Sequence, residues 1–268
     1  MPVVFCPLAS GSDGNSVYIG ADGTHVLIDA GLSGKAMEEA LDIIRLPPGL
    51  LDAIFITHEH GDHIQGAGVL SRRYRIPVYA TKKTWAYMDR KSLLGRIAPE
   101  NKRILPSEGG ACALKGLEVR HFPIPHDAID PVAYTIKTAR HKISVATDMG
   151  HVTDIIKENL SGSDVLYVES NHDLDMLKNG PYPRELKARV MGLKGHLSNA
   201  SAGRLIADVM SERLKYVYLG HMSEENNRPL IALDTVSNIL AADNIVPGVN
   251  VRLYLAHRGM VSDALRLE

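Results

Sequence analysis

The sequence predicts an α/β fold in which two β-sheets pack together with helices outside them, a four-layered αββα sandwich. Short apolar strands alternate with amphipathic helices in both halves of the chain, which is typical of sheets covered by helices. Two segments, VLIDAG (26–31) and SVATDMG (144–150), each end an apolar strand in Asp-x-Gly, which hints at an internal duplication. No low-complexity linker divides the 268 residues, so we expect a single domain that spans residues 1–268.

The first half of the chain is rich in strands. Gly and Asp turns separate the first three, and the helix that follows them ends at LPPG. In chain order we expect strands VVFCPLA, SVYIGA and HVLIDA, helix GKAMEEALDII, strand AIFIT (53–57), helix HIQGAGVLSRRY, and strands VYAT, LEVRHFPI, VAYTIKTA and HKISVAT.

Helices and strands alternate from residue 154 onward. We expect helix DIIKENL, strand VLYVES, helices PRELKARVMG and SAGRLIADVMSERL, strand YVYLG, helix LIALDTVSNILAA and strand VRLYLA. The last thirty residues or so carry no motif that assigns them a role.

The composition excludes several classes of protein. The hydrophobic fraction is 45%, which suffices for a globular core, and Cys6 and Cys112 alone do not suggest a disulfide framework. The N-terminus lacks the pattern of a signal peptide, and no run of 18 or more apolar residues occurs, so we expect a soluble cytoplasmic protein with no membrane partner. A net charge of −1 excludes a uniformly basic nucleic-acid binder but not a local basic patch.

Side chains that can bind metals are concentrated in THEHGDH at residues 57–63. Residues two apart in an extended segment point the same way, so His58 and His60 can converge on one ion. The chain then turns at Gly61, and Asp62 and His63 open a helix, so they face differently and could serve a second ion. A lone Asp at this place would be an ordinary helix N-cap, but three neighbouring histidines favour a ligand.

Ligand-type side chains also end four later strands: His126, Asp148, Glu169 and His221. Together with THEHGDH this makes five strand ends, which favours a shared active-site edge. Histidine and carboxylate ligands suit zinc, manganese or iron rather than calcium or magnesium alone. An aspartate can bridge two ions about 3.5–4 Å apart, as in two-metal hydrolases.

The pattern His-x-His-x-Asp-His after an apolar strand, with later His, Asp and His at strand ends, resembles the metallo-β-lactamase superfamily. The resemblance implies the αββα fold and two divalent ions per chain, zinc or manganese, with iron also suitable. It implies that one ion is bound by His58, His60 and His126, and the other by Asp62, His63 and His221, with Asp148 bridging the two. Asp29 in LIDAG matches an aspartate that supports the ligands in this superfamily.

Six motifs resemble a narrower group, the YycJ/WalJ-like family of bacterial metal-dependent DNA exonucleases. They are LASGSDGNS (8–16), LIDAGLS (27–33), PHDAIDP (125–131), ESNHD (169–173), KGHLSN (194–199) and LGHMSEENNRP (219–229). The resemblance covers roughly residues 5 to 235. Ser is frequent in the family where this chain has Asp13 and Gly61, and neither of these is an expected ligand.

Two further features favour phosphodiester chemistry. His196 in GHLSN and Glu169 resemble the His–Glu pair of RNA-processing nucleases in the superfamily, which protonates the leaving oxygen. The alternatives are a histidine near a helix N-cap and a solvated strand end. The loop SGSDGNS, with Ser10, Gly11 and Asn15, can cradle a phosphate with its backbone N–H groups, or it is a plain hairpin turn.

The segment 72–103 has ten basic residues against Asp89 and Glu100, with Tyr and Trp interleaved. We expect Arg72 and Arg73 to bind the nucleic-acid backbone, and the aromatic residues to stack on bases. The alternative is a solvated basic face with aromatic side chains partly in the core.

These observations predict a two-metal nuclease, and the family resemblance makes it a 5′-to-3′ DNA exonuclease. Asp62 would orient the attacking hydroxide as well as bind metal. The alternatives are an RNA-processing nuclease, a thioester or lactam hydrolase on the same scaffold, and a regulatory protein on a degenerate scaffold, which the complete ligand set disfavours. The 73 residues from Asp148 to His221 leave no room for a β-CASP insertion. The oligomeric state and the role of His172 stay open.

Overall fold

The structure is a computed structural model that describes residues 2–106 and 109–268. The chain divides into two compact units. Unit 1 is formed by the chain up to His121 together with Ala128–Val132 and His257–Glu268, and unit 2 by Phe122–Asp127 and Ala133–Ala256. The expected single domain stays a prediction.

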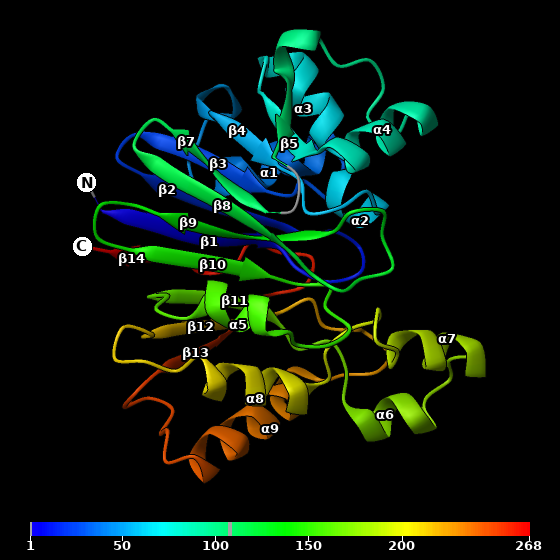
Figure 1. Cartoon of the computed structure of the whole chain (residues 1–268), viewed down its shortest axis with the longest axis vertical. Helices are drawn as coiled ribbons and strands as arrows, with labels where there is room; N and C mark the ends of the chain where they lie inside the picture. Colours follow the sequence, from blue (N-terminus) through cyan, green and yellow to red (C-terminus); the bar gives the residue numbers. More distant parts are fainter. Residues whose placement is uncertain (1, 107–108) are drawn as a thin grey trace. The chain divides into compact units, whose positions relative to one another are not determined.

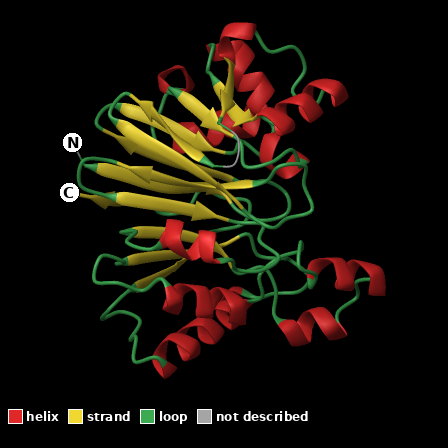
Figure 2. Cartoon of the chain, in the orientation of Figure 1, coloured by secondary structure: helices red, strands yellow, loops and turns green. Residues whose placement is uncertain are grey.

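The described strands form two seven-stranded sheets, drawn in yellow in Figure 2. The first sheet consists, in spatial order, of β14 (Leu265–Leu267), β1 (Val3–Ala9), β2 (Ser16–Ala21), β3 (Thr24–Ile28), β4 (Ala53–Phe55), β5 (Val78–Thr81) and β6 (Lys102–Leu105). The second consists of β13 (Arg252–Leu255), β12 (Tyr216–Gly220), β11 (Val165–Glu169), β10 (Lys142–Ala146), β9 (Val132–Lys137), β8 (Leu117–Pro123) and β7 (Gly110–Leu114). The division between the units runs through β8.

In unit 1, strands β3 to β6 are parallel neighbours in chain order. Helices α1 (Gly34–Ile43), α3 (Ala67–Tyr74) and α4 (Lys82–Lys91) connect them in turn, and Figure 1 shows these helices together beside the parallel strands. Right-handed crossovers between strands that follow one another in a sheet place all the helices on one face. The residues that follow β3 and β4 therefore leave the sheet at the same edge. The remaining helical turns are η1 (Pro48–Leu50), α2 (Gly61–Ile64) and η2 (Pro99–Asn101).

The core of unit 1 lies between these helices and the sheet. Helix α1 buries Met37 and Leu41, which belong to one apolar cluster with Leu27 and Ile54 from the strands and Leu70 from α3. Burying such side chains contributes about 1.5–3 kcal/mol each. This packing holds the ends of β3 and β4, where the candidate ligands begin, in fixed positions.

Unit 2 repeats the arrangement with parallel strands β10 to β13. Its helices are α5 (Asp154–Leu160), α6 (Leu174–Asn179), α7 (Arg184–Val190), α8 (Asn199–Asp208) and α9 (Pro229–Ala242). Helices α8 and α9 pack side by side against β11 to β13 (Figure 1), and their Leu205, Ile206, Val236 and Leu240 join the apolar cluster of this unit. The ends of β10, β11 and β12 thus share one edge.

Two predicted helices have different boundaries in the structure. The segment 63–74 is not one helix, because α2 ends at Ile64 and α3 begins at Ala67. The break lies at Gly66, whose N–H donates to Ala30 O and where a Cβ atom would lie 2.6 Å from Leu32 O. The helix predicted at 201–214 spans Asn199–Asp208, because Ser198 caps its first turn and residues 211–214 form a separate turn.

Seven elements in the described part of the chain were not predicted: α4, α6, β6, β7, β14 and the short turns η1 and η2. None of the helices in the described part of the chain is long and apolar enough to cross a bilayer.

Candidate active site

The ligand-type residues of THEHGDH lie close together in unit 1. The Nε2 atom of His58 is 3.0 Å from Nδ1 of His60, and Nε2 of His63 is 3.4 Å from Oδ2 of Asp62. His60 is extended, with φ −64° and ψ 146°, and it is the N-cap of α2, so Asp62 is not the cap. The expected grouping of these four side chains is therefore present within this unit, and metal binding by them stays a prediction.

Thr57 fixes the ring of His58, although the sequence did not single it out. Its hydroxyl lies 2.7 Å from Oδ2 of Asp29 and 2.9 Å from Nδ1 of His58. Because a hydroxyl has one hydrogen, which goes to the carboxylate, it must accept from Nδ1–H of His58. This tautomer leaves Nε2 of His58 as the ligand atom. The only signal for Thr57 in the sequence was its position directly before His58.

Asp29 follows β3 in the left-handed region, with φ 60°, and its carboxylate contacts His63. Oδ2 is 2.7 Å from Nδ1 of His63, and Oδ1 accepts the N–H of Thr57 at 2.8 Å. Burial raises the pKa of Asp29, and the contacts with His63 and Thr57 oppose this rise. The carboxylate holds the Nδ1–H tautomer of His63, so that Nε2 is available for a metal, which is the arrangement that carboxylate–histidine–metal triads have.

The predicted phosphate-binding loop is turned toward the ligands. Asn15 lies 3.2 Å from Asp62 Oδ2 and 3.2 Å from His63 Nε2 through its Nδ2 atom. The N–H of Gly11 donates to Asn15 Oδ1, and the N–H of Asn15 donates to Asp62 O. Ser10 is buried. These two N–H groups therefore already donate to acceptors within the protein. Substrate binding by Ser10, Gly11 and Asn15 stays a prediction.

The two arginines predicted to bind substrate are engaged with unit 1 itself. Arg72 donates to the carbonyl of Leu94. Arg73 donates to both carboxylate oxygens of Glu38, at 2.6 and 2.9 Å. Of the interleaved aromatic residues, Trp85 is buried in the core, as the alternative reading of this segment expected. Nucleic-acid binding by Arg72 and Arg73 stays a prediction.

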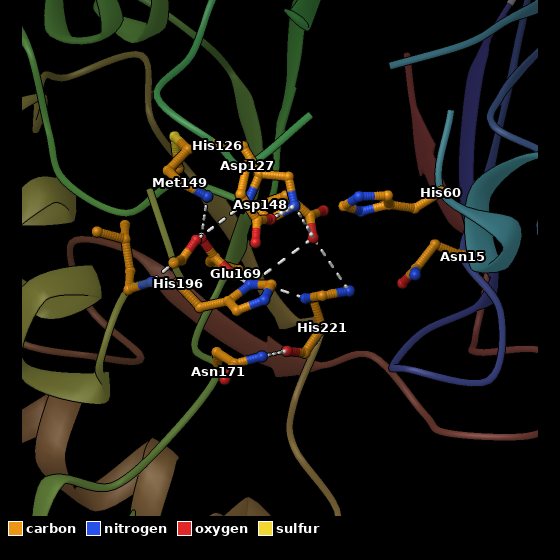
Figure 3. A network of polar contacts seen from close by, with 12 residues as sticks. Asn15, His60, His126, Asp127, Asp148, Met149, Glu169, Asn171, His196 and His221 are labelled. Carbon is orange, nitrogen blue, oxygen red and sulfur yellow. Dashed lines mark hydrogen bonds and ion pairs between the residues drawn. The ribbon is translucent and has the colours of Figure 1, made fainter. Parts of the chain in front are cut away.

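In unit 2, three histidines surround Asp148, which follows β10 with φ 61°. Its Oδ1 atom lies 3.4 Å from Nε2 of His221, 3.8 Å from Nε2 of His126 and 3.7 Å from Nδ1 of His196, as Figure 3 shows. Potential ligand atoms of His126, Asp148 and His196 lie within 4.8 Å of one another, and so do those of Glu169, His196 and His221. Imidazole and carboxylate donors at this spacing fit a divalent transition metal.

His126 is oriented by the loop before His196. Its Nδ1 atom is 3.2 Å from the carbonyl of Gly195, so Nδ1 carries the proton and Nε2 faces Asp148. Burial lowers the pKa of His126. The neutral ring is the form that binds a metal at neutral pH.

Glu169 ends β11 with no solvent exposure, which excludes the solvated strand end considered as an alternative. One oxygen, Oε1, accepts the N–H groups of Met149 and Leu197. The other, Oε2, lies 3.0 Å from Nδ1 of His196 and 3.6 Å from Nδ1 of His221. Burial raises the pKa of this carboxyl, but the hydrogen bond with His196 and the contact with His221 outweigh burial, and the pKa of Glu169 lies below its usual range.

His196 is not the N-cap of α8, because Ser198 Oγ accepts the N–H of Ser201 in that role. Its side chain is 18% exposed, so one edge of the ring is bound to Glu169 while the ring still reaches solvent. A histidine in this setting can pass a proton between solvent or substrate and the protein.

A buried amide network, which the sequence did not reveal, joins the motifs of unit 2. The Nδ2 atom of Asn171 donates to the carbonyl of His221 at 2.9 Å (Figure 3), and its N–H donates to Leu197 O at 3.0 Å. Beside it, the side chains of Asn199 and Asn227 bond each other in both directions. The asparagines of ESNHD, KGHLSN and LGHMSEENNRP were the available signal.

His172 is 1% exposed, and its Nδ1 atom has no hydrogen-bond partner in the described part of the chain. Burial lowers its pKa to about 4. No contact assigns it a role in the candidate site.

Comparison with known proteins adds to this geometry. The family described as β-lactamase superfamily domain matches residues 24–222. Exodeoxyribonuclease YycJ of Bacillus anthracis is 40% identical over 240 residues, which cover 90% of each chain. Exodeoxyribonuclease WalJ of Streptococcus pneumoniae serotype 2 is 38% identical over 247 residues, covering 92% of this chain and 91% of that protein.

Among solved structures, the metallo-β-lactamase fold protein YhfI from Bacillus subtilis matches with a TM-score of 0.72. The match covers 97% of this chain and 98% of that protein at 16% identity, so it concerns the fold alone. It confirms the predicted fold class.

Proposed function

The chain belongs to the metallo-β-lactamase superfamily and, within it, to the family of the YycJ and WalJ exodeoxyribonucleases, and from this membership we propose that it is a two-metal DNA exonuclease. The hydrogen bond between Glu169 and His196 is the observation that carries this proposal furthest. A hydrolase that cleaves phosphodiesters needs an acid for the departing oxygen, and this buried pair provides one.

Two divalent ions, zinc or manganese with iron also suitable, are part of the proposal. The proposed ligands are His58, His60 and His126 for one ion and Asp62, His63 and His221 for the other, with Asp148 shared. The support is the family motif and the imidazole and carboxylate donors found together within each unit. When bound, the ions would supply an activated water near neutral pH and stabilise charge on the phosphoryl group.

The protein's own groups would do the remaining work. Asp62 would orient the attacking water toward phosphorus. Glu169 holds Nδ1 of His196, so the opposite ring nitrogen, Nε2, would donate its proton to the departing 3′-oxygen. The product would then carry a 5′-phosphate.

Several finer points belong to the same proposal. The relatives are named exodeoxyribonucleases, which favours DNA over RNA, and the 5′-to-3′ direction rests on the family resemblance. A cytoplasmic location agrees with the unpaired thiols of Cys6 and Cys112. We also propose that the chain acts as one domain without a β-CASP insertion.

A substrate panel tests the activity. Single- and double-stranded DNA, labelled at either end, RNA of the same sequence and a thioester are each incubated with the purified protein and manganese or zinc. We expect stepwise shortening of DNA with release of 5′-mononucleotides. Cleavage of RNA alone would instead support an RNA-processing nuclease, and cleavage of the thioester alone would support the other hydrolase class.

Metal analysis tests the two-ion centre separately. After purification with excess metal and gel filtration, we expect two ions per chain. Fewer than one ion per chain would contradict the proposed centre, whatever the substrate panel shows.

A further inference from the structure

A basic hollow lies in unit 1 at the C-terminal end of α3, outside the candidate active site. It has a volume of about 670 Å³, and its polar lining residues are Ser71, Arg72, Arg75, Arg96, Glu100 and Asn101. The residues come from two segments, the end of α3 and the loop before β6. Arg72 joins the segments by donating to the carbonyl of Leu94.

The charge of this hollow is not neutralised. Three guanidinium groups line it against one carboxylate, that of Glu100. The guanidinium groups of Arg75 and Arg96 have no hydrogen bond or ion pair with any described residue. By contrast Arg73, which does not line the hollow, is paired with both carboxylate oxygens of Glu38. Two free guanidiniums facing one cavity can bind a phosphate group through charge-assisted hydrogen bonds.

Ser71 gives an independent indication of a ligand. It is 1% exposed, it lines the hollow, and its hydroxyl has no hydrogen-bond partner among the described residues. A serine within a helix usually bonds the carbonyl one turn back, and a buried hydroxyl without a partner is unfavourable. Rotation of the side chain toward the hollow would let an oxygen of a bound anion provide the missing partner.

The simplest alternative is that the arginines only complement the helix dipole. Cations near the C-terminus of a helix are stabilising, and Arg72, Arg73 and Arg75 are all near the end of α3. This does not account for Arg96, which comes from the other segment, nor for the hydroxyl of Ser71. An apolar ligand is disfavoured because six of the eight lining residues are polar or charged, and three of these are arginines.

The hollow is separate from the candidate ligands of the same unit. Helix α3 connects β4 to the parallel strand β5, so its C-terminal end lies at the edge where β5 begins, away from THEHGDH. Its eight residues span roughly 12 Å at about 1.5 Å per residue. A group bound at this end of α3 would therefore lie too far from THEHGDH to be the phosphate that reacts.

We propose that this hollow binds a phosphate group, and that on the proposed function the group is a backbone phosphate of the DNA at some distance from the bond that is cut. Such a contact adds to affinity and to its salt dependence without taking part in the chemistry. A free phosphate ion or the terminal phosphate of a mononucleotide has the same chemistry, and the experiment separates these sources.

The test compares Arg75→Gln/Arg96→Gln with Lys35→Gln/Arg45→Gln, a control that removes the same charge from exposed positions of unit 1 outside the hollow. Binding of labelled single- and double-stranded DNA is measured by fluorescence anisotropy in chelator, over a range of salt concentrations and without phosphate buffer. We expect the slope of log K against log salt to fall by about 1–2 in the hollow variant relative to the control. Thermal melting checks that both variants fold.

A second arm uses inorganic phosphate and a mononucleotide, with binding followed by calorimetry. Loss of phosphate binding in the hollow variant, with an unchanged DNA slope, would identify the free anion as the ligand. If neither binding differs from the control, the site is refuted. Because all binding is measured without metal, a wild-type protein that cuts no DNA would contradict the proposed function but not the phosphate site.

Discussion

The Nδ1 atom of His196 lies 3.0 Å from Oε2 of Glu169, and the same oxygen lies 3.6 Å from Nδ1 of His221. One buried carboxylate therefore orients both a candidate acid and a candidate metal ligand. Because of this double role, we expect substitution of His196 and substitution of Glu169 to have different effects on metal binding.

For His196→Ala we expect turnover to fall roughly 10²- to 10⁴-fold, because the acid is lost, while metal content stays at the wild-type level. For Glu169→Gln we expect both a fall in turnover and a metal affinity roughly 10- to 100-fold lower, because His221 loses its partner. Turnover and bound metal are measured on the same samples. The control is His151→Ala, which removes a partly exposed histidine bonded to Leu193 O, and equal losses in this variant would refute the assignment.

Asp29→Asn tests whether the charge of Asp29 supports His63. Asparagine tolerates the left-handed conformation of this residue, so the backbone should be kept. We expect a metal affinity roughly 10- to 100-fold lower in competition with a chelator. Asp22→Asn is the matched control, since Asp22 is also left-handed, with φ 51°, but lies in an exposed turn. Unchanged affinity in Asp29→Asn would contradict the supporting role.

Asn171→Asp tests the amide network. The substitution keeps the shape but turns the donor to His221 O into an acceptor, so a buried hydrogen bond becomes a repulsion. We expect a stability loss of about 1–3 kcal/mol in chelator. We also expect a larger loss in saturating metal, because His221 is displaced. Asn159→Asp removes a comparable bond at an exposed position and serves as the control. A loss that is the same with and without metal would mean that Asn171 only stabilises the fold.

His172 predicts a pH dependence of stability. Burial lowers its pKa to about 4 in the folded state, below the ordinary value of 6.5. Between these values the unfolded chain binds a proton that the folded chain does not, so stability falls as the pH falls from 6.5 to 4. In metal-free protein, we expect His172→Asn to remove up to roughly 3 kcal/mol of this decrease. Denaturant unfolding at several pH values checks it, and parallel curves for both proteins would refute it.

Two glycines near the ligands predict opposite outcomes. A Cβ atom at Gly31 would lie 1.7 Å from Asp62 O, whereas at Gly61 it would meet nothing within 4 Å. We expect Gly31→Ala to cost at least about 2–4 kcal/mol and to lower metal affinity, because α2 must move. Gly61→Ala, in the first turn of α2, should be neutral or stabilising by up to about 1 kcal/mol. Thermal melting with and without metal measures both.

The sequence predicted those parts of the fold that have local signals. Strands β3–β5 and β10–β13 were predicted, with the helices between most of them, because each of these strands contains a short apolar run. Strand β14 was not predicted because it has only three residues, and what makes it a strand is its pairing with β1. The break at Gly66 was missed because it accompanies a hydrogen bond from the N–H of Gly66 to Ala30 O, and Ala30 comes from another part of the chain.

The candidate site was predictable to a similar extent. The ligand-type residues at strand ends could be recognised because the apolar strands before them were predicted. Glu169 and His196 could be paired only through the family resemblance, since 27 residues separate them. Thr57 and Asn171 act through a hydroxyl and an amide that contact histidines, and neither residue type is distinctive in a sequence.

Strand β14 closes the first sheet by pairing with β1, and Ser262 adds a bond from its N–H to Pro7 O. The two partners lie far apart in the sequence, at Val3–Ala9 and Leu265–Leu267, so a ribosome that has finished β1 must make all of unit 2 before β14 emerges. At about 5–20 residues per second, β1 waits roughly ten to fifty seconds with one edge unpaired. Its exposure to chaperones and to other nascent chains is thus set by the speed of translation, and slow codons in the second half of the gene would prolong it.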